Sequence, residues 1–259
     1  MPTQQIEWAD GSGDKIYITS PDFSGNQQIA VSSDPNTGAA RSKVVTFSAG
    51  NVSKTLTVEQ AAGQMQPVFY TYLIFDGKAY IDTDIVLSNN DTVRVGLGNE
   101  TQKKAQKIFL AGNIGAVLSS STNSTNRFFT IYYGKSSYVS SGQRLAWTYE
   151  SYSFYLTPKR YGWGNAGYGF TKGSTAPTSP LVLGSNNAHD GLPYTGKMRQ
   201  IRLYGSDAQD ITKDSDLNSY TPYATLRPCT YNGVPGLWHV EQNKFYGNSA
   251  GVGSLSVSN

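Results

Sequence analysis

The chain has 259 residues, of which 38% are hydrophobic and only 15% are charged, and its 27 glycines accompany many serines, threonines and asparagines. This composition is typical of β-rich, turn-rich domains and excludes a disordered chain or a helical bundle. The net charge is only +3 and the lysines and arginines are scattered along the sequence, which argues against a nucleic-acid partner.

The first part of the chain predicts a small β-domain over residues 1–63. The segments 15–19 (KIYIT) and 28–32 (QIAVS) alternate apolar with polar residues, and Gly, Pro or Asp bounds each of them. With the hairpin that follows, they give at least four strands in a unit near the lower size limit for independent folding.

Residues 37–62 predict a tight β-hairpin. Its apolar and β-branched positions alternate with polar residues on both sides of a turn at 49–51, and they are Val44, Thr46, Leu56 and Val58. A second turn, at 35–38, stands before the hairpin. This order of signals resembles the second half of a BACON domain, a small immunoglobulin-like sandwich common in gut Bacteroides and their phages. The resemblance implies a module that binds or spaces.

A short linker at 64–67 is predicted to separate this unit from a larger one at 68–259. The larger segment contains strand patterns divided by clusters of Ser, Asn and Gly, which favours a β-sandwich over a parallel α/β sheet. The clearest predicted strands are 92–97, 107–110, 128–133, 151–156, 181–183, 197–204 and 236–240. One short helix is predicted near 207–218.

Three ordered motifs in the larger unit are AYIDTDI at 79–85, GKMRQIRLY at 196–204, and LRP at 226–228 with GVPGLWHVEQNKFYGNSAGVGSL after it. Together they resemble the concanavalin A-like jelly rolls of the LamG type. The expected fold is therefore all-β, with a small immunoglobulin-like sandwich followed by a larger concanavalin A-like jelly roll. Trp238 and His239 stand where the closing motif of that family has Tyr and Asp, so no role of that Asp is carried over.

A BACON-like unit followed by a LamG-type jelly roll resembles a head fibre, or capsid-decorating protein, of crAss-like Bacteroides phages. The N-terminus has neither a basic nor an apolar segment of the kind found in signal peptides. The resemblance implies a non-enzymatic protein of the virion surface, made in the host cytoplasm. Its partners would be capsid protein, a second or third copy of itself and host or mucin glycans, without a membrane partner. The alternatives are a secreted lectin-like Bacteroides protein and a jelly-roll glycoside hydrolase.

Catalytic residues are not evident. Glycosidases use two carboxylates flanking the scissile bond, whereas the glutamates here are isolated, with only Glu150 in an aromatic setting. Neither His189 nor His239 accompanies a nucleophile motif. We therefore expect no catalytic site, although convergence of Glu150 with a second carboxylate would support the hydrolase alternative.

The candidate ligand site is the Gly-rich segment 161–169. It is predicted to be a loop whose large rings face outward, because glycine permits turn conformations. The residues expected to contact carbohydrate are Tyr161, Trp163, Asn165 and Tyr168. Protein contact and simple packing explain the same aromatic residues, and both alternatives stay open.

No cofactor is expected, and calcium is left open. LamG-type domains often hold calcium at a loop rim, and the candidate ligands here are Asp76, Asp82, Asp84, Asp190 and Asp207. They do not form a spaced acidic loop, and turns explain the Asp-Gly pairs equally well. The single cysteine, Cys229, is expected to be a small buried residue.

Overall fold

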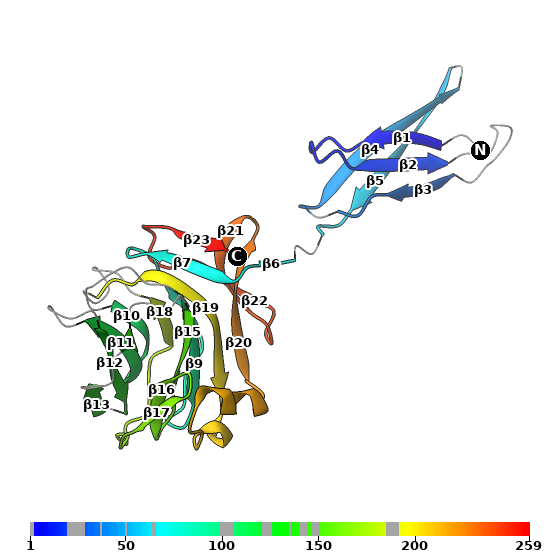
Figure 1. Ribbon diagram of the computed structural model, residues 1–259. Coiled ribbons are helices and arrows are strands. Elements are labelled where there is room, and N and C mark those ends of the chain that lie inside the picture. Colours follow the sequence, from blue (N-terminus) through cyan, green and yellow to red (C-terminus); the bar gives the residue numbers. More distant parts are fainter. Residues whose placement is uncertain are drawn as a thin grey trace. The chain divides into compact units, whose positions relative to one another are not determined.

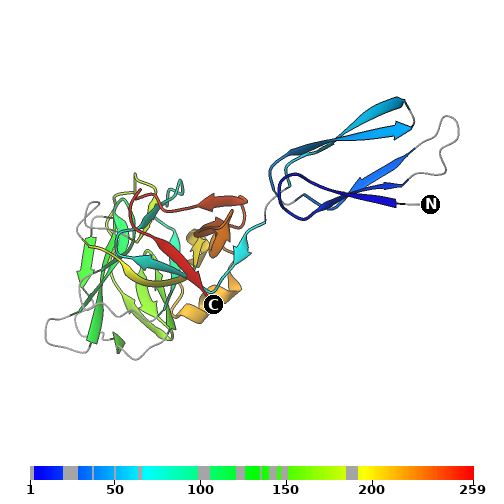
Figure 2. The same ribbon diagram turned by 90° about the horizontal axis from the view of Figure 1, so that it is seen from above.

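The fold is known from a computed structural model (Figures 1 and 2). It describes residues 3–19, 29–36, 38–49, 51–63, 66–98, 106–120, 126–134, 136–139, 145–146, 151–184 and 192–259. The chain forms two compact units, Met1–Gln66 and Pro67–Asn259. This division falls within the predicted linker at 64–67.

The N-terminal unit has two antiparallel sheets. The first has the order β1-β2-β3, with β1 at Thr3–Glu7, β2 at Lys15–Thr19 and β3 at Ala30–Ser33. The second is a hairpin of β4, Arg41–Ala49, and β5, Val52–Gln60. One small apolar core is built from both sheets, and its buried residues are Trp8, Ile16, Ile18 and Val45. The predicted alternation in β2 is confirmed, since Ile16 and Ile18 face this core.

The hairpin is confirmed, and the inward position of its first strand is Val45 rather than Val44 or Thr46. Val44 is 58% exposed and Thr46 is exposed, whereas Val45 is only 6% exposed and lies opposite Leu56. Side chains alternate along a strand, so a pair of adjacent valines leaves open which of them points inward. Because Val45 pairs with Leu56 of β5, it is Val45 that points toward the core.

Arg41 holds this hairpin to the segment between β1 and β2. Its side chain is 7% exposed, and its guanidinium lies 2.8 Å from Asp10 and 2.9 Å from Asp14. It also stacks 4.5 Å from the centre of the Trp8 ring. The hydrogen bond from Arg41 holds the pKa of the Asp10 carboxyl well below its usual range, because the charged form of the acid is the one that accepts it.

The C-terminal unit contains two larger antiparallel sheets (Figure 1). One has the order β13-β12-β11-β10-β18-β8, with β14 also beside β12. The strand bounds are β13 Ser136–Val139, β12 Asn126–Tyr133, β11 Ile114–Ser120, β10 Gln106–Ala111, β18 Leu181–Gly184, β8 Tyr80–Asp82 and β14 Leu145–Ala146. We call this the β10 sheet.

The second sheet, which we call the β19 sheet, has the order β17-β16-β15-β9-β19-β20-β21-β22. In addition, β7 pairs with β19 and β23, and β6 pairs with β20. The bounds are β17 Ala166–Gly169, β16 Arg160–Trp163, β15 Ser151–Leu156, β9 Thr92–Gly98, β19 Thr195–Tyr204, β20 Ala224–Tyr231, β21 Val234–His239, β22 Lys244–Tyr246, β7 Tyr72–Asp76, β23 Leu255–Ser258 and β6 Val68–Phe69.

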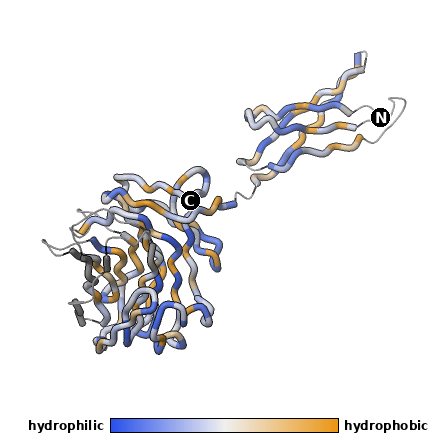
Figure 3. The backbone as a smooth tube through the Cα atoms, viewed as in Figure 1, coloured by the Kyte–Doolittle hydropathy of each residue, from blue (hydrophilic) through white to orange (hydrophobic). Residues whose placement is uncertain are grey.

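Both sheets contribute to the large apolar core of this unit. Phe109 of the β10 sheet packs against Phe154 of the β19 sheet, with ring centres 6.5 Å apart. Figure 3 shows the alternation of hydrophobic and hydrophilic residues along many of the strands, which is the pattern expected when one face of a sheet is buried. The expected all-β sandwich architecture is confirmed, and each of the predicted strands exists with ends shifted by a few residues.

The short helix predicted near 207–218 is replaced by two 3-10 helices, Ser206–Ala208 and Asp214–Ser219. The Asp216 carboxylate accepts hydrogen bonds from the backbone N–H groups of Thr212 and Lys213. Such local bonds from Asp side chains compete with a continuous helix and favour short turns.

Candidate functional site

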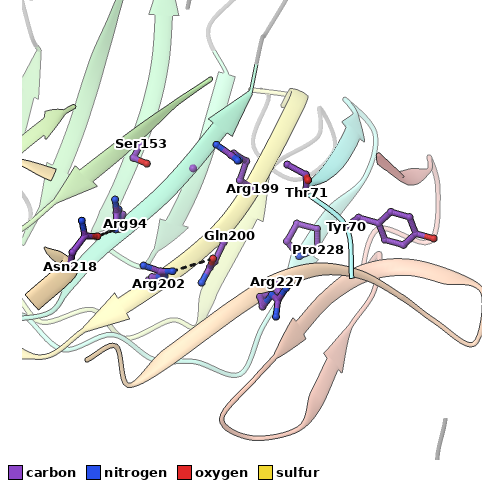
Figure 4. A pocket seen from close by; sticks show the side chains of 11 residues that line it. Tyr70, Thr71, Arg94, Ser153, Arg199, Gln200, Arg202, Asn218, Arg227 and Pro228 are labelled. Carbon is purple, nitrogen blue, oxygen red and sulfur yellow. Dashed lines mark hydrogen bonds between the residues drawn. The ribbon is translucent and has the colours of Figure 1, made fainter. Parts of the chain in front are cut away.

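A groove of about 490 Å³ lies on the outer face of the β19 sheet. Figure 4 shows side chains from β9, β15, β19 and β20 around it, together with residues of the segment before β7. We call it the arginine groove. The described residues that line it are Tyr70, Thr71, Arg94, Gly96, Ser153, Arg199, Gln200, Arg202, Asn218, Arg227 and Pro228.

Strand alternation places the polar residues of β9 and β15 in this groove. Val93, Val95 and Leu97 of β9 are fully buried in the core, so the residues between them, Arg94 and Gly96, face the other side of the sheet. Ser153 of β15 pairs with Gly96. These two small residues leave space between the longer arginine side chains.

A β-bulge in β19 brings two neighbouring residues to the same face. Met198 pairs with Leu97 of β9, but the next core residue of β19 that pairs is Ile201, and the register shifts between them. One extra residue therefore lies between two inward-facing positions, so both Arg199 and Gln200 line the groove. The bulge adds a polar side chain that a regular strand would have turned into the core.

Gly96 has a steric reason to be glycine. A Cβ atom at this position would lie 2.8 Å from the Cβ of Arg199, which is closer than such atoms approach in proteins. The absence of a side chain at Gly96 lets Arg199 lie across β9. The glycine thus shapes the groove as well as the strand.

Only one of the four arginines in the groove has an acidic partner among the described residues. Arg94 lies 2.5 Å from the Asp214 carboxylate and donates a hydrogen bond to Asn218 at 3.1 Å. In the part of the chain that the structure describes, no carboxylate forms an ion pair with Arg199, Arg202 or Arg227. The groove therefore carries a local excess of positive charge.

Neighbouring side chains position the other three guanidinium groups. Arg227 lies 4.0 Å from the centre of the Phe69 ring, and Arg199 lies 5.3 Å from that of Tyr72. Arg202 is within hydrogen-bond distance of the Gln200 amide (Figure 4). Stacking on a ring occupies a face of the guanidinium and leaves its N–H edges able to donate.

The segment 161–169, predicted to be a loop, is instead the hairpin of β16 and β17, which is a correction to the sequence analysis. Tyr161 is 5% exposed and belongs to the core, so the expectation of an outward ring is wrong for this residue. Asn165 is exposed and follows Gly164, whose φ of 54° forms the turn. The other glycines belong to strands, and Gly162 and Gly167 leave space for the Tyr155 side chain.

Trp163 and Tyr168 are half-buried and contact the core. Their ring centres lie 5.4 Å apart, and Tyr168 is also 5.6 Å from Tyr161. The rings of this hairpin stack on one another, which favours the packing alternative for much of their surface. Their proposed contact with carbohydrate stays a prediction.

The other sequence candidates lie partly inside and partly outside the described residues. Glu150, His189 and Asp190 lie outside the described residues. His239 is buried, and its Nδ1 accepts a hydrogen bond from the Gln242 backbone at 3.2 Å. Cys229 is buried as expected, and burial raises the pKa of its thiol to about 11.

The described aspartates among those considered for calcium have protein partners or are exposed. Asp76 accepts hydrogen bonds from the backbone of Lys78, Ala79 and Ser254. Asp84 accepts from Lys244 at 2.6 Å and from the Tyr246 hydroxyl, while Asp82 and Asp207 are exposed. Among the described residues, no three His, Cys, Asp or Glu side chains lie together as a metal site.

Within the same residues, no helix has the length and apolar character needed to cross a membrane.

Sequence reasoning missed the arginine groove because its four arginines are separated by up to 133 positions in the chain, from Arg94 to Arg227. A signal was present in the alternation of 92–98, where Arg94 and Gly96 take the positions between the apolar residues Val93, Val95 and Leu97. The pairing of β9 with β19 then sets Arg94 directly opposite Arg202. That pairing cannot be read from either strand alone.

Comparisons with known proteins support the fold. No protein-family model and no curated protein matches the chain. Among solved structures, a candidate carbohydrate-binding protein from Bacteroides ovatus has a similar fold, with a TM-score of 0.50 and 12% sequence identity. The match covers 99% of this chain and 82% of that one. The resemblance to BACON domains and phage head fibres, the capsid partner, the dimer or trimer and the virion location stay predictions.

Proposed function

We propose that this chain is a non-catalytic carbohydrate-binding protein and that the arginine groove receives the sugar. The observation that carries the proposal is the groove itself, a hollow of about 490 Å³ whose walls are made mainly of polar side chains. Sugar-binding sites need many directional hydrogen-bond donors and acceptors on an open surface, and this groove provides both.

The residue types suit sugar hydroxyl groups. Ser153 and Thr71 supply hydroxyls that both donate and accept, while Gln200 and Asn218 supply amides with both functions. Ser153 and Gln200 stand on strands rather than on loops, so a ligand would find these two groups already positioned.

The fold likeness supports the same proposal. The protein from Bacteroides ovatus that shares the fold is described as a candidate carbohydrate-binding protein. Among the alternatives raised by the sequence, the lectin-like protein is therefore better supported than the virion protein or the hydrolase. The proposed binding does not depend on where the protein acts.

A glycan array tests the function, and two substitutions test the location. The full chain is applied to an array of neutral and acidic glycans, alongside Ser153→Trp and Trp163→Ala. Ser153 lies in the groove beside Gly96, so an indole there fills the hollow without changing its charge. We expect Ser153→Trp to lose glycan retention and Trp163→Ala to keep it. Thermal melting of each variant establishes that it is folded.

Two results would contradict the proposal. Retention of no glycan by the folded wild-type chain would exclude carbohydrate binding of useful affinity. Loss of retention in folded Trp163→Ala with full retention in Ser153→Trp would move the site to the hairpin of β16 and β17. The second result would favour the site that was predicted from the sequence.

A further inference from the structure

We infer that the ligand of the arginine groove is an acidic polysaccharide, one whose sugars carry carboxylate or sulfate groups. The inference rests on the proposed function and goes beyond it by naming the chemical class of the sugar. Both acidic groups present a cluster of negatively charged oxygens to a guanidinium, and arginine binds either with two parallel hydrogen bonds.

The charge balance of the groove is the first argument. Four of its eleven described lining residues are arginines, and none of the eleven is acidic. Asp214 compensates Arg94 alone, so Arg199, Arg202 and Arg227 face the groove without a carboxylate partner among the described residues. Neighbouring positive charges repel one another. An anionic ligand relieves that repulsion, whereas a neutral sugar does not.

The positioning of the guanidinium groups is the second argument. The guanidinium groups of Arg227 and Arg199 lie over the rings of Phe69 and Tyr72, and this attraction restrains them before any ligand arrives. Restrained donors lose less conformational freedom on binding than mobile surface lysines do. Arg202 adds a third guanidinium group, and this residue pairs with Arg94 of the neighbouring strand. Several guanidinium groups are thus spaced along two strands. This arrangement suits a polysaccharide with repeated acidic groups better than it suits a single small anion.

The rest of the groove favours a sugar over a nucleic acid. Proteins that bind single strands present open aromatic rings on which bases stack. Here Gly96 and Ser153 lie between the arginines, and Tyr70, which is half-buried, is the single aromatic residue of the described lining. The rings of Phe69 and Tyr72 beside the groove already carry guanidinium groups. Hydroxyl and amide groups lie between the charges, where sugar hydroxyls would follow an acidic substituent.

The test uses two pairs of polysaccharides that differ mainly in charge. Polygalacturonate is compared with its fully methyl-esterified form, which isolates the carboxylate, and κ-carrageenan is compared with its chemically desulfated form, which isolates the sulfate. Affinity electrophoresis of the full chain measures retention in each. We expect at least one acidic polymer to bind about tenfold or more tightly than its neutral partner, and the binding to weaken as salt is raised.

Arginine variants locate the effect. Arg199→Gln and Arg202→Gln each remove one positive charge from the groove, while Lys54→Gln removes one from an exposed position on β5 and serves as the matched control. We expect each arginine variant to weaken retention by the acidic polymer about tenfold and the control to change it less than twofold. Because Arg199 is exposed, its replacement should leave the fold intact, and thermal melting checks this.

Different outcomes would contradict the acidic class of the ligand and carbohydrate binding itself. Equal binding of neutral and acidic partners, lost in Ser153→Trp, would overturn the acidic class and leave carbohydrate binding in place. Binding of none of the four polymers, together with an empty glycan array, would overturn both. Binding of an oligo-deoxythymidine probe as tightly as the acidic polymer would overturn the inference by showing a general anion site.

Discussion

At the scale of single residues, His239 occupies the position at which the predicted LamG-type closing motif would have an Asp. The side chain is 2% exposed, and its Nδ1 lies 3.3 Å from a Glu241 carboxylate oxygen as well as accepting from the Gln242 backbone. Burial lowers the pKa of this histidine below 6.5, although the nearby Glu241 and Asp84 carboxylates oppose the change. The folded protein therefore favours the neutral imidazole more strongly than the unfolded chain does.

A depressed histidine pKa makes the folded protein sensitive to mild acid. Below pH 6.5 the unfolded chain takes up a proton at His239 more readily than the folded chain does, so the free energy of unfolding falls as the pH drops. The contribution is fully present above pH 6.5 and is lost from there down toward the folded pKa. We expect urea denaturation to show a steeper loss of stability from pH 7.5 to 5 in the wild-type chain than in His239→Gln. Parallel pH profiles for the two proteins would contradict this.

At the scale of elements, the β16–β17 hairpin depends on two glycines that face each other across its strands. Gly162 pairs with Gly167, and the Tyr155 hydroxyl lies 3.2 Å from the Ala166 carbonyl oxygen and 3.0 Å from that of Thr212. The tyrosine ring of β15 thus occupies the space that side chains at both glycines would take. Burial raises the pKa of Tyr155 to about 12, so its hydroxyl stays protonated and able to donate.

A methyl group at Gly167 should disrupt this arrangement. Its Cβ would overlap both the Tyr155 hydroxyl and the Thr212 carbonyl oxygen. We expect Gly167→Ala to lower the free energy of unfolding by about 1–3 kcal/mol, as other overpacked sites do. Gly169→Ala is the control in the same strand, because its Cβ would come no closer than 3.9 Å to the Lys159 carbonyl oxygen. Urea denaturation compares the two, and equal stability would show that Tyr155 does not restrain the hairpin.

The strands β9, β16 and β17 show how much of the structure the sequence predicts. Periodicity of two located the strands, since core residues such as Val93, Val95 and Leu97 recur at every second position. The glycine content of 161–169 led to the wrong prediction of a loop. A glycine required for a turn, such as Gly164, cannot be told in sequence from one required beneath an aromatic ring, such as Gly167. Local patterns therefore predict the elements and not what packs on them.

The candidate site was beyond local prediction for a different reason. The arginine groove needs the antiparallel register of β9 with β19 and the bulge between Met198 and Ile201. Both depend on contacts between residues about a hundred positions apart in the chain, and no local propensity encodes them. The sequence pattern pointed instead to the Gly-rich segment 161–169, whose aromatic rings the fold uses largely for packing.

At the scale of the whole molecule, the chain consists of two units whose cores are built separately. The large core contains no described residue before Leu73, and the small one contains none after Val58. Every described residue that lines the arginine groove lies between Tyr70 and Pro228, within the unit Pro67–Asn259. The proposed binding site is therefore the property of one unit.

It follows that a chain beginning at Pro67 should still bind. We expect residues 67–259, produced alone, to retain the acidic polysaccharide within about twofold of the full chain, since a separately built core of this size supports independent folding. Residues 1–66 should show no retention in the same gels. Thermal melting and circular dichroism establish that the shortened chain is folded. If a folded 67–259 chain loses binding, the N-terminal unit must contribute to the ligand contact, and the groove alone does not account for recognition.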